Sequence, residues 1–276
     1  MWTQIVGKTR LELTPLVNHW WNTALHVSAR GLYSRPIPFQ DIVFDIEFDF
    51  IRHKLVIRTN DGGERTMELA PRSVADFYKE YMSCLRSLGV EVRINTMPAE
   101  FADAIPFEKD TKHASYDKEY ASRFFRILLN SDRVLKQFRS GFIGKCSPVH
   151  FFWGGFDLAV TRFSGRRAPE RPELDNMQRE AYSHEVTSVG FWPGDGRFPE
   201  AAFYGYAAPS PEGLSKEPVR PTAAFFDTTL GEFLLKYDDV RKAQQPDAAI
   251  LDFCQSTYEA GAKLAKWDRK NLAREL

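Results

Sequence analysis

Residues 42–50 read IVFDIEFDF, with an apolar side chain at every second position from Ile42 to Phe50. Because successive side chains of a strand point to opposite faces, this period of two predicts a half-buried strand with an acidic outer face. The turn sequence Asn60-Asp61-Gly62-Gly63 separates two further predicted strands, residues 54–59 and 66–69. The region from residue 42 to residue 69 is therefore predicted to be an antiparallel meander.

A helix is predicted directly after this meander. Ser73 is predicted to be the N-cap, and Asp76, three residues later, is predicted to complete a variant capping box. Gly89 is predicted to end the helix. Residues at helical spacing predict one buried face, which includes Phe77, Met82 and Leu85. A short strand is expected at residues 90–94.

The second half predicts a similar order of elements. A long helix is expected from Asp117 to about Arg139, with a buried stripe that includes Tyr120, and a last helix begins near Asp247. Strands are expected at 156–163, 185–192, 202–207, 223–226 and 232–235. We accordingly predict a first repeat at 1–95, a linker at 96–115 and a second repeat at 116–276, which could also form one compact domain.

An internal duplication supports this division. Gly7-Lys8 precedes the aromatic run 17–21, and Gly144-Lys145 precedes the aromatic run 149–153. Each run leads into a predicted strand, residues 25–28 and 158–161, so we predict an α+β fold of two meander-and-helix repeats related by a pseudo-two-fold axis. A helix precedes the second Gly-Lys but is expected to be missing before the first, and the native chain could start upstream of Met1.

Composition excludes several classes of protein. The 276 residues include 37 basic and 37 acidic side chains, so the net charge of zero argues against a nucleic-acid partner. No stretch reaches the roughly 18 apolar residues of a membrane helix, and no secretory signal is visible. The odd and widely spaced Cys84, Cys146 and Cys254 favour a reducing cytoplasm over a disulfide framework.

Several long motifs resemble an uncharacterised bacterial domain-of-unknown-function family of about this length. The motifs are residues 2–8, 71–78, 142–153, 156–167, 180–185 and 190–194. Members of that family usually carry a further N-terminal helix. The resemblance implies a cytosolic bacterial protein and transfers no activity, cofactor or catalytic residue.

The candidate site residues gather around the two duplicated segments. We predict a small-molecule pocket between the repeats in which His150, His184 and Glu185 transfer protons and Lys145 and Arg162 hold an anionic substrate. The same hypothesis assigns ligand-binding roles to four further residues, Arg166, Trp153, Lys8 and His19.

Structural roles compete with each of these assignments. The histidines could be hydrogen-bonded core residues, Gly144 could be a helix C-cap, and the arginines could anchor loops to Glu170 or Glu173. His150, His184 and either Asp157 or Glu185 could hold a metal, although none is predicted. Cys146 could be a reactive thiolate or a buried structural thiol. The alternative function is a non-catalytic protein–protein interaction module, and the cofactor and the oligomeric state stay unknown.

Overall fold

The computed structural model describes residues 1–274 and divides into two compact units. The first unit comprises Met1–Val17, Trp21–Leu129 and Phe151–Gly155, and the second comprises Asn18–Trp20, Asn130–His150 and Phe156 onward. The predicted linker, residues 96–115, therefore lies inside the first unit, and the chain passes into the second unit within a helix.

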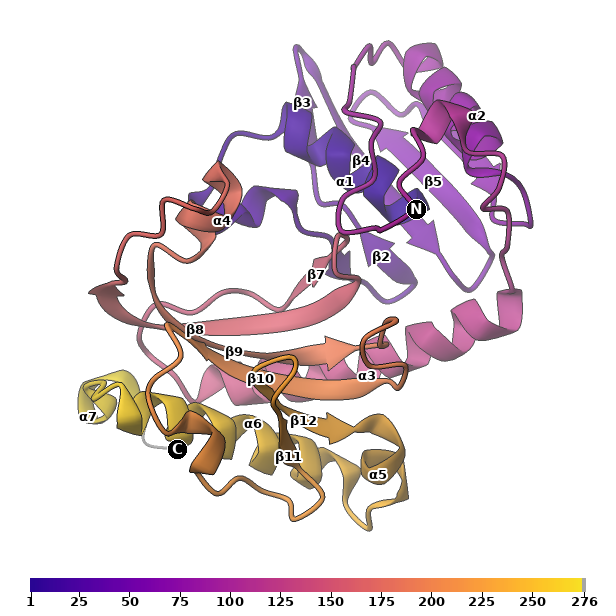
Figure 1. Ribbon diagram of the computed structural model, residues 1–276. Helices are drawn as coiled ribbons and strands as arrows, with labels where there is room; N and C mark the ends of the chain where they lie inside the picture. The colour runs from indigo at the N-terminus through magenta and orange to yellow at the C-terminus, as the bar shows by residue number, and fades with distance from the viewer. Residues whose placement is uncertain (275–276) are drawn as a thin grey trace. The chain divides into compact units, whose positions relative to one another are not determined.

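The first unit contains two long helices, the start of a third and six short strands (Figure 1). In chain order they are α1 (Trp2–Leu13), β1 (His26–Val27), β2 (Gly31–Tyr33), β3 (Ile37–Phe39), β4 (Ile42–Asp49), β5 (Lys54–Thr59), β6 (Glu64–Glu68), α2 (Val74–Ser87), the 3-10 turn η2 (Phe107–Lys109) and the first part of α3 (Lys118–Ser140). A further 3-10 segment, η1 (Asn18–Thr23), begins in the second unit and ends in the first.

The predicted meander is present as the centre of an antiparallel sheet. The strand order is β1-β2-β4-β5-β6, and β3 pairs with β4. Phe44, Ile46 and Phe48 are buried, which confirms the apolar face of β4. The prediction of an exposed acidic face was wrong, because Glu47 is 8% and Asp49 only 1% exposed. Ser28 donates a hydrogen bond to Glu47, and the Arg30 guanidinium lies 2.7 Å from Asp49, so these carboxylates are satisfied inside the unit.

Helices α1 and α2 pack against each other and against this sheet. Trp2 stacks on Phe77 at 4.6 Å between ring centroids, and the Tyr81 hydroxyl donates to Thr9 at 2.8 Å. Phe77, Met82 and Leu85 are buried as predicted. The Ser73 hydroxyl accepts a hydrogen bond from the Asp76 backbone N–H, which confirms the N-cap.

Two expectations for helices and one for a strand differ from the structure. Gly7-Lys8 lies inside α1, whereas Gly144-Lys145 follows α3, so the two Gly-Lys pairs occupy different local structures. Tyr120 is 69% exposed, and the buried stripe of α3 begins one turn later, near Phe125. Residues 90–94 are extended but belong to no strand, because they have no sheet partner.

The second unit holds the rest of α3 and most elements of the second half. They are β7 (His150–Phe152), which passes into the first unit after His150, β8 (Asp157–Arg167), α4 (Asn176–Ala181), β9 (His184–Trp192), β10 (Ala202–Ala208), η3 (Leu214–Lys216), β11 (Phe225–Asp227), β12 (Glu232–Lys236), α5 (Tyr237–Lys242), α6 (Pro246–Leu264) and α7 (Arg269–Leu272). The predicted strands and the last helix are confirmed with shifts of only a few residues.

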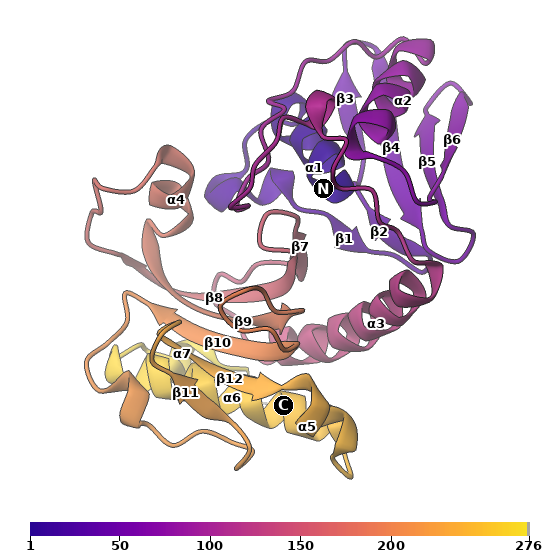
Figure 2. The ribbon, with the colours of Figure 1, turned by 45° about the vertical axis from the view of Figure 1, so that its right-hand side comes forward.

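The second sheet is antiparallel and its two faces differ. The strand order is β11-β12-β10-β9-β8, with β7 at the edge beside β8. Helix α6 runs along one face, where Thr257 touches Gly205 and Gly261 touches Ala207 (Figure 2). The opposite face carries Phe163, Ser188 and Tyr206, because strand side chains alternate. We refer to it as the polar face. Two six-stranded antiparallel sheets with packed helices confirm the α+β class and fit the interpretation of two repeats.

Residues 1–274 contain no helix that is both long and apolar enough to span a membrane.

Candidate functional site

The structure brings together three of the predicted site residues in the second unit. Lys145 Nζ lies 2.6 Å from His19 Nε2, and the ring centroids of His19 and His184 are 5.8 Å apart. The ring of Phe163, on the polar face, packs against His19 at 4.6 Å and lies 5.0 Å from Lys145 Nζ. We call these four side chains the histidine–lysine cluster.

Local backbone geometry places His19 in this cluster. His19 and Trp20 have φ values of 61° and 60°, the left-handed region that non-glycine residues seldom adopt. The His19 backbone N–H donates to Glu180 Oε1 at 3.2 Å, and its ring Nδ1 lies 3.0 Å from the Glu180 carbonyl oxygen. Residues 18–20 are therefore held in the second unit by contacts with the end of α4.

These contacts fix the protonation of His19. A carbonyl oxygen only accepts hydrogen bonds, so His19 Nδ1 must carry the proton that bonds to Glu180. Nε2 then has a lone pair, which accepts a hydrogen bond from the Lys145 ammonium. Burial lowers the pKa of His19 and the nearby Lys145 cation lowers it further, while burial also lowers the pKa of Lys145. His19 is therefore a neutral imidazole beside a cation.

The tautomer of His184 follows from a similar argument. Ser183 Oγ donates its only proton to the Glu180 carbonyl at 2.7 Å, and it lies 3.0 Å from His184 Nδ1. His184 Nδ1 must therefore be the donor in that pair, and Nε2 is left with its lone pair. Burial, Lys145 and Arg167 all lower the pKa of His184, so this imidazole is also neutral near pH 7 and its Nε2 can accept a proton.

A cavity of about 260 Å³ adjoins the cluster through Ser183. It is lined by the loop before α4 and by the helix itself, and its charged lining consists of Arg167, Arg171, Arg179 and Glu170. Arg171 pairs with Glu173 at 3.2 Å, so the three arginines face two nearby glutamates and give this cavity, which we call the α4 cavity, a small excess of positive charge. Such a lining attracts carboxylates and phosphates, which Arg binds through its planar fork.

Four other predicted site residues of the second unit have structural surroundings. Arg162 lies on the α6 side of the sheet, 2% exposed, with its guanidinium 3.5 Å from the Phe138 ring centroid. Arg166 pairs with Glu185 at 2.7 Å, so its partner is neither Glu170 nor Glu173 as expected. His150 is 2% exposed at the start of β7.

Lys8 and Trp153 belong to the first unit, so the described geometry of the cluster does not include them. Lys8 is 7% exposed within α1, and burial lowers its pKa. Trp153 Nε1 donates to the Thr23 carbonyl at 2.9 Å, and its indole lies against Gly7.

The surroundings of Cys146 and the spacing of the potential ligands bear on the thiol and metal alternatives. Burial raises the pKa of Cys146 to about 11, which favours a structural thiol over a thiolate nucleophile. Within the described residues, no three His, Cys, Asp or Glu side chains are grouped closely enough to hold a metal ion.

Sequence reasoning missed a hydroxyl-rich network on the polar face. Tyr204 donates to Asp157 at 2.5 Å, Tyr206 and Tyr182 hydroxyl oxygens are 3.1 Å apart, and Ser188 lies 2.9 Å from Thr161. Burial and the Asp157 charge raise the pKa of nearby Glu232 to about 7. The alternation of Tyr204 and Tyr206 in a predicted strand was the available signal, because it places both rings on one face.

Comparison with known proteins gives a family and no activity. A model described as a family of unknown function (DUF5996) matches residues 1–274, which confirms the resemblance to a domain-of-unknown-function family. No curated protein and no solved structure matches the chain.

Proposed function

The chain belongs to this family of unknown function, and from its own site geometry we propose that the second unit binds a small anionic molecule in the α4 cavity, beside the histidine–lysine cluster. The observation that carries the proposal is the contact of Lys145 with a neutral His19, next to a cavity with three arginines. A bound carboxylate or phosphate would relieve the repulsion among these cations.

The cluster also supplies a group for proton transfer. His184 Nε2 holds a lone pair because Nδ1 is committed to Ser183, and Ser183 lines the cavity. A ligand in the α4 cavity would thus lie near a neutral imidazole of lowered pKa, the state that a general base needs near pH 7. We infer that His184 takes up a proton when an anion enters the α4 cavity, because the negative charge offsets the nearby cations.

The test is a thermal-shift and calorimetric screen of inorganic phosphate, citrate and a nucleoside monophosphate against the full chain, with glucose as the neutral control. We expect at least one anion to bind, and we expect Arg167→Ala and Lys145→Met each to weaken it about tenfold. Arg241→Ala is the matched control, because Arg241 is an exposed arginine of the same unit that pairs with Asp238 on α5. Equal losses in all three variants would mean that binding is not at this cavity.

The interaction-module alternative has weaker support. The large apolar side chains that are exposed within residues 1–274 are spread over many elements, from Leu16 and Val43 to Phe101, Ile143 and Met177. Docking surfaces usually gather such side chains in one patch. Failure of every anion to bind would favour this alternative.

A further inference from the structure

A second feature lies in the first unit, at the segment that was predicted to be a strand. Val90, Val92 and Ile94 are buried while Glu91, Arg93 and Asn95 are exposed, which is the alternation of a strand with one face on a core. The segment is extended, yet no strand pairs with it. We call residues 91–95 the open segment.

The backbone of the open segment is unusual in its hydrogen bonding. Across the described chain, the N–H and C=O groups of residues 91–95 form no backbone hydrogen bond, although Val90 N–H donates to Leu85 and Thr96 C=O accepts from Phe107 at its two ends. Extended backbone in this state is a template for another strand, because the donors and acceptors along one edge of an extended chain can form a ladder with an added strand.

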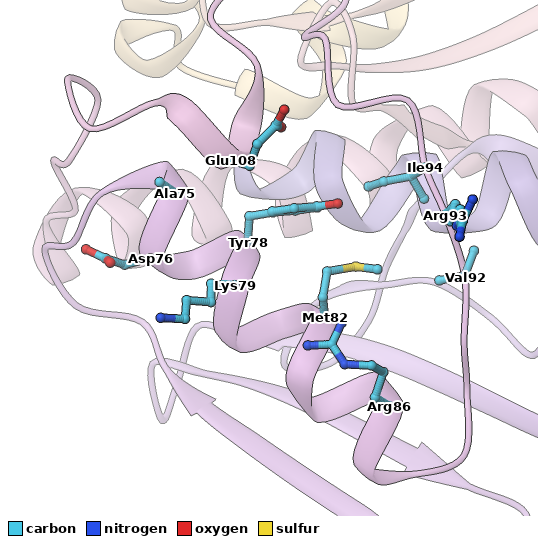
Figure 3. A pocket seen from close by; sticks show the side chains of 10 residues that line it. All are labelled: Ala75, Asp76, Tyr78, Lys79, Met82, Arg86, Val92, Arg93, Ile94 and Glu108. Atoms are coloured by element: carbon cyan, nitrogen blue, oxygen red, sulfur yellow. The ribbon is translucent and has the colours of Figure 1, made fainter.

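A groove lies between this segment and α2 (Figure 3). Its volume is about 720 Å³, within the range of sites that hold small ligands or short peptides. Tyr78 and Met82 project from α2 toward Val92 and Ile94, so the floor of the groove is apolar (Figure 3).

Charged side chains at the groove favour an acidic occupant. Arg86 and Arg93 line the groove, and neither forms an ion pair with any residue between 1 and 274. The acidic Asp76 is already bonded to Ser73 at the helix N-cap, and Glu108 stands at the opposite end of the groove from Arg86 (Figure 3). A carboxylate in the groove would form charge-assisted hydrogen bonds with either of these arginines.

We propose that this groove binds an extended peptide that carries an acidic residue among alternating apolar ones, and that the peptide pairs through its backbone with the open segment as an added β-strand. Backbone pairing supplies the affinity, the floor of Tyr78, Met82, Val92 and Ile94 receives the apolar side chains, and Arg86 with Arg93 selects the acid. This site is in the first unit and does not depend on the α4 cavity.

Hydrogen exchange on the full chain is the first measurement. The amides of residues 91–95 should exchange much faster than those of 55–57 in β5, which are paired within the sheet. Strong protection that grows with protein concentration would instead show that the segment pairs with a second copy of the chain, and it would overturn the proposal.

The probe for binding is a fluorescein-labelled seven-residue peptide that alternates valine with threonine and has a glutamate in place of the central threonine. We expect a Kd below about 1 mM by fluorescence anisotropy and slower exchange of amides 91–95 in the complex. Arg93→Glu and Tyr78→Ala should each weaken binding about tenfold. Lys112→Glu, an exposed charge reversal outside the groove, should leave the affinity unchanged.

Backbone N-methylation separates strand pairing from simple adhesion of apolar side chains. The N–H groups of alternate residues point to opposite edges of a strand, so a peptide methylated at odd positions and one methylated at even positions block different edges. We expect one of the two to lose at least about tenfold in affinity and the other to bind as before. No binding by the unmodified peptide, or equal affinity of all three peptides, would overturn the proposal.

Discussion

Arg162 shows how a single buried cation can be structural. Its Cζ lies 3.5 Å from the Phe138 ring centroid and 4.5 Å from that of Tyr258, and a terminal nitrogen donates to the Phe138 carbonyl. Burial lowers the pKa of the guanidinium to about 10, so it stays charged at pH 7. Contacts with aromatic faces and a carbonyl replace part of the water that the charge has lost, while the buried Nε has no hydrogen-bond partner among the described residues.

This arrangement predicts a contrast between two substitutions. Arg162→Ala should lower the free energy of unfolding by about 2–5 kcal/mol, because it leaves a cavity among the rings of Phe138, Phe142 and Tyr258. Arg162→Met should cost clearly less, since it refills most of the volume without a buried charge. Urea denaturation monitored by circular dichroism measures both. Equal costs would show that the charge and its hydrogen bond dominate over packing.

His184 carries the prediction on pH. Its pKa is lowered by burial and by two neighbouring cations, so it is neutral in the free protein near pH 7. An anion in the α4 cavity would offset the cations and raise that pKa, so binding should be coupled to proton uptake. Affinity should therefore increase as the pH falls from 7.5 to 5.5, and the increase should shrink in His184→Gln. Calorimetry in two buffers of different ionisation enthalpy detects the proton, and buffer-independent heats would contradict the prediction.

The sequence named His19, Lys145 and His184 as candidates but could not show that they meet. The meeting depends on the left-handed backbone at His19 and on the Glu180 carbonyl, both of which are set by contacts between residues 161 positions apart. For the same reason, the sequence could not show that Lys145 and Arg162 have different roles. Lys145 contacts His19 in the cluster, whereas Arg162 is buried on the other face of the sheet.

At the scale of elements, helix α2 gives the clearest stability prediction. Leu85 is fully buried on the face of α2 that also buries Phe77 and Tyr81. Leu85→Ala should lower the free energy of unfolding by about 2–5 kcal/mol. Ser83→Ala is the control, because Ser83 is exposed on the same helix. A loss well under 1 kcal/mol in denaturant melts would mean that this face is not packed.

Helices and strands could be predicted from the sequence where the spacing of apolar residues is sufficient to define them. Strand β5 occupies the expected residues 54–59, because its alternation and its turn are local signals. The segment 90–94 has equally good alternation, yet it is not a strand, because pairing needs a partner that no local pattern can supply. The acidic residues of β4 were wrongly predicted to be exposed. Ser28 and Arg30, in a neighbouring loop, bind the carboxylates of Glu47 and Asp49 and allow them to be buried.

At the scale of the molecule, the two units exchange short pieces of chain. Phe151–Gly155 follows 21 residues of the second unit but belongs to the first, where Phe151 and Leu25 exchange two backbone hydrogen bonds of 2.8 and 2.9 Å. The predicted domains at 1–95 and 116–276 were continuous, because a single sequence gives no sign of such an exchange. Trp153, in the same short piece of chain, packs its indole against Gly7 of α1.

Trp153 therefore carries a prediction for the first unit as a whole. Trp153→Ala removes a side chain that is only 8% exposed and breaks its hydrogen bond to the Thr23 carbonyl, so it should cost about 3–5 kcal/mol. Gly7→Ala should act on the same contact, because an added Cβ would lie 2.2 Å from Trp153 Nε1. Both variants should speed amide exchange in α1 more than in β9 and β10, since the lost contacts are internal to the first unit. Trp192→Ala, in the second unit, is the matched control and should give the reverse order. Equal acceleration of α1 and β9 in every variant would show instead that the whole chain unfolds as one cooperative structure.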